Sequence, residues 1–263
     1  PISVLPELGW RRAGRLALEI VLTDVAVSGV APTHVAVSLT LPPAWSDDDL
    51  EALWTGLADH ADRLGVSIVS GHTARYPGID SSWVGGATVL GAGDRDDIVR
   101  PDGAAAGDDI VVTTGPAAEV TGLFSTLFPE QLGLSPKTVA TAQERVEDIA
   151  AVADARTAFE TGSVTAMHDA TEGGVAGGLV EMASGAGVRF DIDGSAMPVA
   201  PGVVAVCDAV GVDPWQVSSA GTLLCAVESG QGAAVAETIR DSGTPAAVVG
   251  SVTDGEGVFV EDD

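Results

Sequence analysis

The alternation of strand-type and helix-type segments is the feature that most constrains the fold of this chain. Runs in which apolar and polar residues alternate, as in half-buried strands, are followed by runs with apolar residues three or four positions apart, as in amphipathic helices. One such helix is expected to begin after Ser46, which three acids follow, and to stop at Gly65. This alternation predicts an α/β or α+β protein in which helices pack on sheets.

The pattern also predicts how the chain is divided. Residues 91–109 lose all periodicity and gather Gly, Asp and Pro, which indicates a boundary between an N-terminal domain, 1–98, and a C-terminal domain, 99–263. The expected strands cover 34–42, 66–70, 83–91, 110–114, 163–167, 188–193, 222–227, 246–250 and 257–261, and the expected helices cover 12–28, 47–64, 138–160, 202–210, 231–241 and the segment after Gly173 and Gly174.

The net charge limits the partners of the chain. It carries 12 basic and 38 acidic residues, which gives a net charge of −26. Such a surface repels nucleic acid and anionic lipid, so we expect neither as a partner. The 46% content of apolar residues and the steady periodicity argue against disorder. The acidic surface is either simply solvated or belongs to a protein of a high-salt cytoplasm, such as that of a halophilic archaeon. We favour the second, because salt screens the repulsion between carboxylates.

The cysteine content and the apolar runs bear on the cellular compartment. Cys207 and Cys225 are too few for a disulfide framework or a thiolate metal site, which favours a reducing environment. No apolar run reaches the roughly eighteen residues of a membrane span, and no signal peptide is recognisable. We therefore expect a cytoplasmic protein that does not contact membranes.

Two motifs in the N-terminal half place polar groups in apolar surroundings. In "LTDVAVSGVAPTHV", Asp24 falls inside an otherwise apolar helix, where a buried carboxylate is costly unless it is paired or binds a metal. A surface carboxylate is the alternative. In "VSIVSGHTARYPGID", a strand runs into Gly71, His72 and Thr73, and a glycine at a strand end lets the backbone approach a ligand. An ordinary polar turn is the alternative there.

A third motif, "HDATEGGV", lies at the mouth of a helix. A helix that begins near Gly173 leaves its first N–H groups unpaired and positively polarised, so it can hold a phosphate, with Gly173 and Gly174 keeping side chains out of the way. Asp169 could ligate Mg²⁺ or orient a nucleophile, and Thr171 could donate to a phosphate oxygen. The alternative is that Asp169 merely caps the helix, with Glu172 three residues further on.

Several enzyme classes lack their signatures. The sequence contains no G-x-x-x-x-G-K-[ST] loop, no G-x-S-x-G elbow and no H-E-x-x-H helix, which excludes P-loop enzymes, serine hydrolases with that elbow, and zincins. The four histidines are scattered and do not form the spacing of a dedicated zinc site. His168 taken alone is expected to be a packed or hydrogen-bonded side chain.

Together the motifs and their order resemble the aminoimidazole ribonucleotide (AIR) synthase superfamily, and within it the archaeal AIR synthase-related proteins. "LTDVAVSGVAP" is similar to the N-D-[IVL]-A-x-M-G-A-x-P helix of that superfamily, "SGHTARYPG" to its G-G-[EDH]-T-x-x-x-P-G turn, and "HDATEGGV" to its H-D-x-[ST]-x-G-G form. Residues 217–227 and 246–258 resemble its closing strands. The resemblance extends over nearly all of the 263 residues.

The resemblance implies a two-domain α/β (α+β) fold. An N-terminal α/β domain would form a homodimer with its twin, and a C-terminal α/β domain would follow. It also implies ATP bound in a cleft, with its phosphates held through Mg²⁺, and phosphorylation of an oxygen on a small-molecule or protein-borne substrate. Carried over to this chain, the candidate residues are Asp24 and Asp169 as metal ligands, Gly71, His72, Thr73, Gly173 and Gly174 as cofactor-binding residues, and Asp169 and Thr171 as catalytic residues.

The chain also departs from the superfamily's pattern. His72 stands where many members have an acid, and Arg75 stands where AIR synthase has a glutamate. The superfamily's "G-x-D-A-A" phosphate loop and its following "D-P" would lie upstream, since Pro1 resembles that proline. Two functions therefore remain open. One is an ATP-dependent enzyme that phosphorylates a carboxamide, a carboxylate or a similar oxygen. The other is a nucleotide-binding or structural paralogue without turnover.

Overall fold

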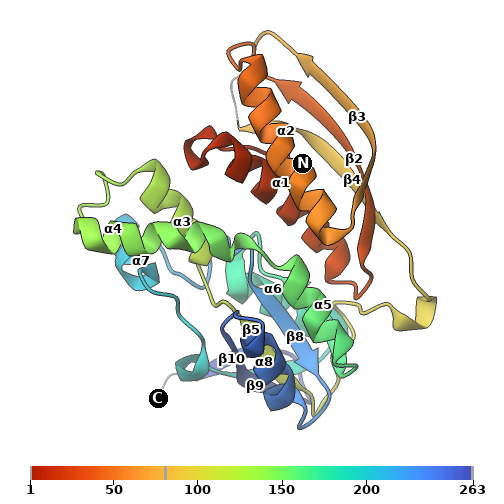
Figure 1. Cartoon of the computed structure of the whole chain (residues 1–263). Helices are drawn as coiled ribbons and strands as arrows, with labels where there is room; N and C mark the ends of the chain where they lie inside the picture. Colours follow the sequence, from red (N-terminus) through yellow and green to blue (C-terminus); the bar gives the residue numbers. More distant parts are fainter. Residues whose placement is uncertain (1, 80–81, 262–263) are drawn as a thin grey trace. The chain divides into compact units, whose positions relative to one another are not determined.

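The computed structural model describes residues 2–79 and 82–261 (Figure 1). These residues form two compact units. The first combines the chain up to Ala26 with Val30–Asp97, and the second combines Val27–Gly29 with the described residues from Ile98 onward. No helix in the described part of the chain has both the length and the apolar character that a bilayer span needs.

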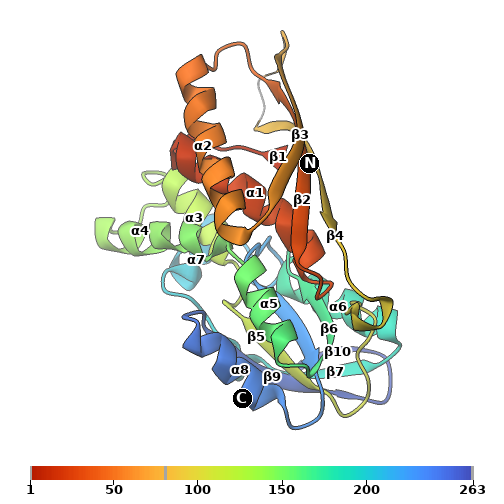
Figure 2. The same ribbon diagram turned by 45° about the vertical axis from the view of Figure 1, so that its right-hand side comes forward.

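The first unit is a four-stranded sheet with two long helices on one face (Figure 2). Its strand order is β1-β4-β2-β3, in which β2 and β3 are parallel and the other pairs are antiparallel. The elements of this unit are β1 (Ile2–Ser3), η1 (Pro6–Leu8), α1 (Trp10–Ala26), β2 (Pro32–Leu41), α2 (Asp47–Leu64), β3 (Ser67–Arg75), β4 (Trp83–Gly91) and η2 (Arg95–Asp97).

The alternation of β2 explains this one-sided arrangement. Val35, Val37 and Leu39 are buried, whereas Ala36 and Ser38 between them are more exposed. Because successive strand residues point to opposite faces, the valines and the leucine form the face that α1 and α2 cover. In the described part of this unit no helix covers the other face.

The start and stop predicted for α2 are confirmed. The Ser46 hydroxyl accepts the Asp49 N–H at 3.1 Å, and the Asp49 carboxylate accepts the Ser46 N–H at 3.0 Å, which forms a capping box. Gly65 ends the helix in the left-handed conformation, with φ 71°.

A close crossing of backbones joins α1 to α2. A Cβ atom at Gly14 would lie 2.0 Å from the Leu53 carbonyl oxygen, and one at Gly56 would lie 1.9 Å from the Arg11 carbonyl oxygen. Only glycine therefore fits at either position. Nearby, the buried carboxylate of Glu19 in α1 and the Nε2 of His60 in α2 form a hydrogen bond inside the helix layer.

The second unit is a six-stranded mixed sheet with the order β10-β7-β9-β5-β8-β6. The β10–β7 pair is parallel, and the others are antiparallel. Its elements are β5 (Asp109–Thr113), α3 (Ala118–Leu127), α4 (Pro136–Gln143), η3 (Glu144–Ile149), α5 (Val152–Glu160), β6 (Val164–Asp169), α6 (Gly174–Ala186), β7 (Arg189–Asp193), η4 (Gly194–Ala196), α7 (Val203–Val210), β8 (Leu223–Val227), α8 (Gly232–Asp241), β9 (Ala246–Thr253) and β10 (Gly257–Glu261).

Helices cover both faces of this sheet (Figures 1 and 2). On one face α6 packs against the sheet, while α8 contacts β5 and β9, and α5 contacts β6 and α8, on the other. The core on the α6 side includes Ile110, Val112, Ala166, Phe190, Ile192, Leu224 and Ala226 from the sheet and Val175, Leu179 and Met182 from the helix.

The prediction of one long helix over 138–160 is wrong. The chain forms α4, then the 3-10 helix η3, and then turns at Ala150, which has the extended angles φ −101° and ψ 119°, before α5 begins. The apolar spacing continues through the break because all three segments pack on the same unit. With neither Gly nor Pro at 144–152, no local signal marks the break.

Helix α3 was not expected from the sequence. It begins after Ala117, a non-glycine residue in the left-handed conformation that no side chain caps among the described residues. A Cβ at Gly122 would lie 2.5 Å from the Val146 backbone nitrogen of η3, so the helix is held by close packing on that segment. Tertiary contact outweighs the low helix propensity of glycine here.

Candidate functional site

The predicted phosphate motif forms the connection between β6 and α6. Asp169 is the last residue of β6, and α6 begins at Gly174 with Gly173 as its N-cap. Among the described residues no side chain caps this helix, so the alternative, a cap by Asp169 with Glu172, is wrong. The reason is geometric, because Asp169 belongs to a strand that ends four residues before the N-cap. The half-buried Asp169 carboxylate therefore makes no capping hydrogen bond to α6.

Gly173 and Gly174 differ in what a side chain at each position would contact. Both have positive φ, 83° at Gly173 and 63° at Gly174. A Cβ at Gly174 would lie 2.4 Å from the Val217 carbonyl oxygen and 2.6 Å from the Trp215 carbonyl oxygen, whereas one at Gly173 would meet its first neighbour at 3.4 Å. Gly174 is thus required by the protein's own packing, and the expectation that it also leaves room for a phosphate stays a prediction.

The start of α6 is partly used by the protein itself. The Gly174 N–H donates to the Thr171 carbonyl oxygen, and the Ala176 N–H donates to the Trp215 carbonyl oxygen, both at 2.9 Å. Two of the first amides of the helix thus already have acceptors. A phosphate placed here would find fewer free amides than a bare helix start offers.

His168 is hydrogen-bonded, as the sequence predicted. Its Nε2 lies 2.9 Å from the Glu181 carboxylate of α6, and its Nδ1 lies 3.4 Å from the Asp169 carboxylate. The hydrogen bond to Asp169 raises the pKa of His168 above its usual range; burial opposes this effect and Glu181 adds to it. Both ring nitrogens of His168 thus face a carboxylate, which favours the protonated form of the imidazole.

Residues 215–222 connect this motif to the loop between β5 and α3. The Ala170 N–H donates to the Thr222 carbonyl oxygen, and the Ser219 N–H donates to the Ala170 carbonyl oxygen, both at 2.9 Å. On its other side the segment binds the β5–α3 loop, because the Thr222 hydroxyl donates to the Gly115 carbonyl oxygen at 2.7 Å. Three connections at one end of the sheet thus form a single hydrogen-bonded group.

Glu119, at the start of α3, belongs to this group and was missed by the sequence analysis. Its carboxylate accepts the Ser218 hydroxyl at 2.5 Å and the Ala220 N–H at 3.0 Å. The neighbouring Ala117 N–H donates to the Ser219 hydroxyl oxygen at 2.8 Å. A signal existed in the sequence, since Glu119 follows the strand at 109–113 and a glycine, but the helix that carries it was not expected.

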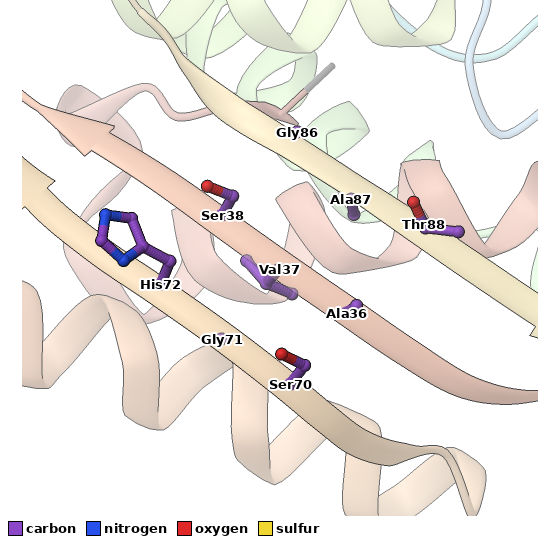
Figure 3. A pocket seen from close by; sticks show the side chains of 9 residues that line it. All are labelled: Ala36, Val37, Ser38, Ser70, Gly71, His72, Gly86, Ala87 and Thr88. Carbon is purple, nitrogen blue, oxygen red and sulfur yellow. The ribbon is translucent and has the colours of Figure 1, made fainter.

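The second predicted motif lies on a strand and not in a turn. Gly71, His72 and Thr73 lie inside β3, which runs on to Arg75 because it pairs with β2 in parallel, His72 opposite Ser38. Gly71 and His72 line a shallow groove on the sheet face that points away from α1 and α2, together with Ser38, Ser70, Gly86 and Thr88 (Figure 3). Strand alternation places Thr73 on the opposite face from His72.

Asp24 lies in α1, as expected, and its side chain is exposed. Its exposure agrees with the alternative of a surface carboxylate, and its role as a metal ligand stays a prediction. Its carboxylate is not among the groups that line the groove at His72. The structure thus brings Asp169, Thr171, Gly173 and Gly174 together in one connection and Gly71 and His72 together in one groove.

The donor set limits how a metal can be held. In residues 2–79 and 82–261 no group of three or more His, Cys, Asp or Glu side chains is arranged to hold a metal ion. Mg²⁺ usually binds through one or two carboxylates and completes its shell with water and phosphate oxygens. A single carboxylate such as that of Asp169 is compatible with this mode. Thiolate ligation does not fit, because both cysteines are buried and burial raises the pKa of Cys225 to about 12.

The family of the chain follows from comparison with known proteins. Residues 2–92 match the N-terminal domain of AIR synthase related proteins, and residues 105–263 match the C-terminal domain of the same family. The chain therefore belongs to the AIR synthase related family, with the two-domain mixed α/β fold described above.

Its relatives include proteins of hydrogenase maturation and purine synthesis. The chain is 29% identical to carbamoyl dehydratase HypE of Escherichia coli over 93% of this chain and 71% of that protein. It is also 29% identical to the PurL subunit of phosphoribosylformylglycinamidine synthase from a Parafrankia species, over 92% of this chain but only 31% of that protein.

Solved structures agree with these likenesses. Escherichia coli HypE superimposes with a TM-score of 0.82 at 29% identity, covering 94% of this chain and 76% of that one. A HypE structure solved in complex with ATP gives a TM-score of 0.81 at 25% identity, covering 95% of this chain and 76% of that one.

Proposed function

We propose that this protein binds ATP and uses it to phosphorylate, and so activate, a carboxamide or similar oxygen on its substrate. The observation that carries the proposal is the likeness to carbamoyl dehydratase HypE, which extends through both units of the chain. A HypE structure with bound ATP supports the choice of nucleotide. The substrate itself is small or borne by a protein, as the resemblance implies.

The chemistry follows from the poor leaving ability of an amide oxygen. Transfer of the γ-phosphoryl group from ATP to that oxygen forms an O–P bond and releases ADP. The oxygen then departs with the phosphate as the C–O bond breaks, while the amide nitrogen loses its protons, and a carbamoyl group becomes a nitrile. The same phosphorylated amide can instead be attacked by a nucleophile at carbon.

In this proposal Asp169 is the residue that acts on the nucleotide's magnesium or on the reacting oxygen. Mg²⁺, when bound, neutralises phosphate charge. Asp169 would supply a carboxylate to the ion, with His168 and the 170–173 connection fixing its place. Thr171 would donate a hydrogen bond to a phosphate oxygen of the nucleotide.

The test replaces Asp169 by asparagine. We expect carboxamide-dependent phosphate release with Mg·ATP to fall by about 10²-fold or more, because the charge is lost, while stability to denaturant changes by less than about 1 kcal/mol. Glu181→Gln is the matched control, since it removes the other carboxylate contact of His168 and should retain turnover. Equal turnover in wild type and Asp169→Asn would remove the assigned role of Asp169.

A nucleotide-binding or structural paralogue without turnover is the second candidate. His72 in place of an acid, and the protein acceptors already bound to Gly174 and Ala176 amides, favour it. Calorimetry distinguishes the two functions. Tight Mg·ATP binding with no phosphate release from any carboxamide or carboxylate supplied would select the paralogue.

We further propose that the first unit forms a homodimer through the sheet face seen in Figure 3. Small side chains such as Ala36, Ser38 and Thr88 lie along that face, and no helix of the unit's described residues covers it. Leu90 on β4 is 56% exposed. A second copy of the same face would cover these groups in a two-fold contact.

A further inference from the structure

Glu119 stands out as a half-buried carboxylate whose side-chain hydrogen bonds cross to a segment about a hundred residues away. It accepts the Ser218 hydroxyl at 2.5 Å and the Ala220 N–H at 3.0 Å. Hydrogen bonds that involve an ionised acceptor are about twice as strong as neutral ones. The carboxylate therefore ties residues 215–222 firmly to the start of α3.

The tied segment is itself the support of the 170–173 connection. Its Thr222 and Trp215 carbonyl oxygens accept the Ala170 and Ala176 amides, and its Ser219 N–H donates to the Ala170 carbonyl oxygen, all at 2.9 Å. Ser219 and Ala170 are fully buried. A displacement of residues 215–222 would therefore move the backbone that carries Thr171 and Gly173.

The β5–α3 loop that leads into Glu119 is a strained base for this contact. Thr114 and Ala117 both adopt left-handed backbone conformations, with φ 58° and 59°, which non-glycine residues rarely adopt. The surrounding bonds hold that conformation, since the Thr114 hydroxyl donates to the Gly221 carbonyl oxygen at 3.2 Å and the Ala117 N–H donates to the Ser219 hydroxyl oxygen at 2.8 Å. Both bonds lead to residues 215–222.

We infer that Glu119 is a positioning residue: by binding Ser218 and Ala220 it fixes residues 215–222, which in turn hold the connection that carries Asp169, Thr171 and Gly173. This inference rests on the proposed function, because it gives Glu119 a role through the same site. In this role the Glu119 side chain acts as a hydrogen-bond acceptor toward residues 215–222 and does not itself contact a ligand. A glutamine can accept the same two hydrogen bonds, whereas an alanine cannot.

Hydrogen exchange followed by mass spectrometry tests the inference without any substrate. Amide exchange over residues 170–176 is compared in the wild type and four variants, with β7 as an internal reference in the same unit. We expect exchange over 170–176 to be about tenfold faster in Glu119→Ala, and less so in Ser218→Ala, which removes one of the two bonds. Glu119→Gln, which keeps the acceptor but not the charge, should lie much closer to the wild-type rate than Glu119→Ala does.

Asp109→Ala is the matched control. Asp109 is also a half-buried carboxylate that accepts a distant backbone amide, that of Gly232 at 2.9 Å, but it supports α8. It should leave 170–176 unchanged. Wild-type protection over 170–176 in both Glu119→Ala and Ser218→Ala, equal acceleration of β7, or Glu119→Gln behaving like Glu119→Ala would each overturn the inference.

Binding and turnover of Mg·ATP are measured on the same variants. These measurements distinguish a failure of the proposed function from a failure of the inference about Glu119. We expect Glu119→Gln to restore Mg·ATP turnover that Glu119→Ala loses, with the loss in kcat. A wild type that neither binds nor hydrolyses Mg·ATP would refute the proposed function, while the exchange pattern would still decide the role of Glu119. Wild-type turnover combined with an unchanged exchange pattern in Glu119→Ala would refute the positioning role alone.

Discussion

At the residue scale, Gly174 shows how a structure changes the meaning of a motif. Its glycine identity follows from the carbonyl oxygens of Trp215 and Val217, which occupy the space of a side chain. In the motif "HDATEGG", the last glycine is therefore needed for close backbone packing, whereas the first residues carry polar side chains. Asp169 and Thr171 remain the residues with groups to offer a ligand.

This geometry gives a prediction for alanine at the two glycines. Gly174→Ala should lower the free energy of unfolding by about 2–4 kcal/mol, because the new methyl group meets fixed backbone and φ is positive. Gly173→Ala has a similar φ but open space, so it should cost no more than about 1–2 kcal/mol. Chemical denaturation measures both, and equal stability of the two variants would contradict the packing explanation.

At the element scale, the crossing of α1 and α2 depends on two glycines. Gly14 and Gly56 let the helix backbones touch, since a Cβ atom at these positions would lie only 2.0 and 1.9 Å from a carbonyl oxygen of the facing helix. The helices together cover one face of the sheet, so their separation sets how the apolar side chains of β2 are buried. Each glycine weakens its own helix by about 1 kcal/mol relative to alanine, and the close packing offsets that loss.

Alanine at Gly14 or Gly56 should therefore destabilise the protein in spite of its better helix propensity. We expect each change to cost about 2 kcal/mol or more, because backbone on the facing helix must shift. Gly177→Ala in α6 is the control, since its nearest neighbour would lie at 3.3 Å and a small shift accommodates it. If denaturant titration gave Gly56→Ala and Gly177→Ala the same stability, the backbones of α1 and α2 would be able to move apart at little cost in free energy.

At the scale of the whole molecule, self-association should depend on the open sheet face of the first unit. We expect light scattering at micromolar concentration in high salt to give a dimer, because that face would otherwise leave Leu90 exposed to water. Thr88→Arg, which places a charge in the middle of the face, should give a monomer. Glu51→Arg on the outer side of α2 should remain dimeric, and a monomeric wild type would decide against the contact.

The net charge of −26 predicts a strong dependence of stability on salt. Repulsion among carboxylates is screened over about 10 Å at 0.1 M salt and about 3 Å at 1 M. The thermal unfolding temperature should therefore rise between about 0.1 M and 3 M KCl, with most of the rise complete near 1 M. An unfolding temperature that stays constant across that range would show that the acidic surface is simply solvated.

Whether a feature could be predicted from the sequence depended on how far apart along the chain the interacting residues lie. Helix α2 was predicted at both ends because Ser46, Asp49 and Gly65 act within one turn of the helix. The edges of β4 and the face of β2 that would be buried were also readable, since strand alternation is a local pattern. The order of the motifs was enough to place the chain in its family.

Contacts between distant segments decided the rest. The break at Ala150, the presence of α3 and the extension of β3 through His72 arise from packing and strand pairing that no short window contains. In the candidate site, the sequence by itself proposed Asp169 and Thr171 as candidates, because a polar cluster before a helix is visible in a few residues. Only the tertiary structure joined Glu119 to Ser218 and Ala220, because that contact depends on a backbone path about a hundred residues long that brings the start of α3 to the end of β6 and the start of β8.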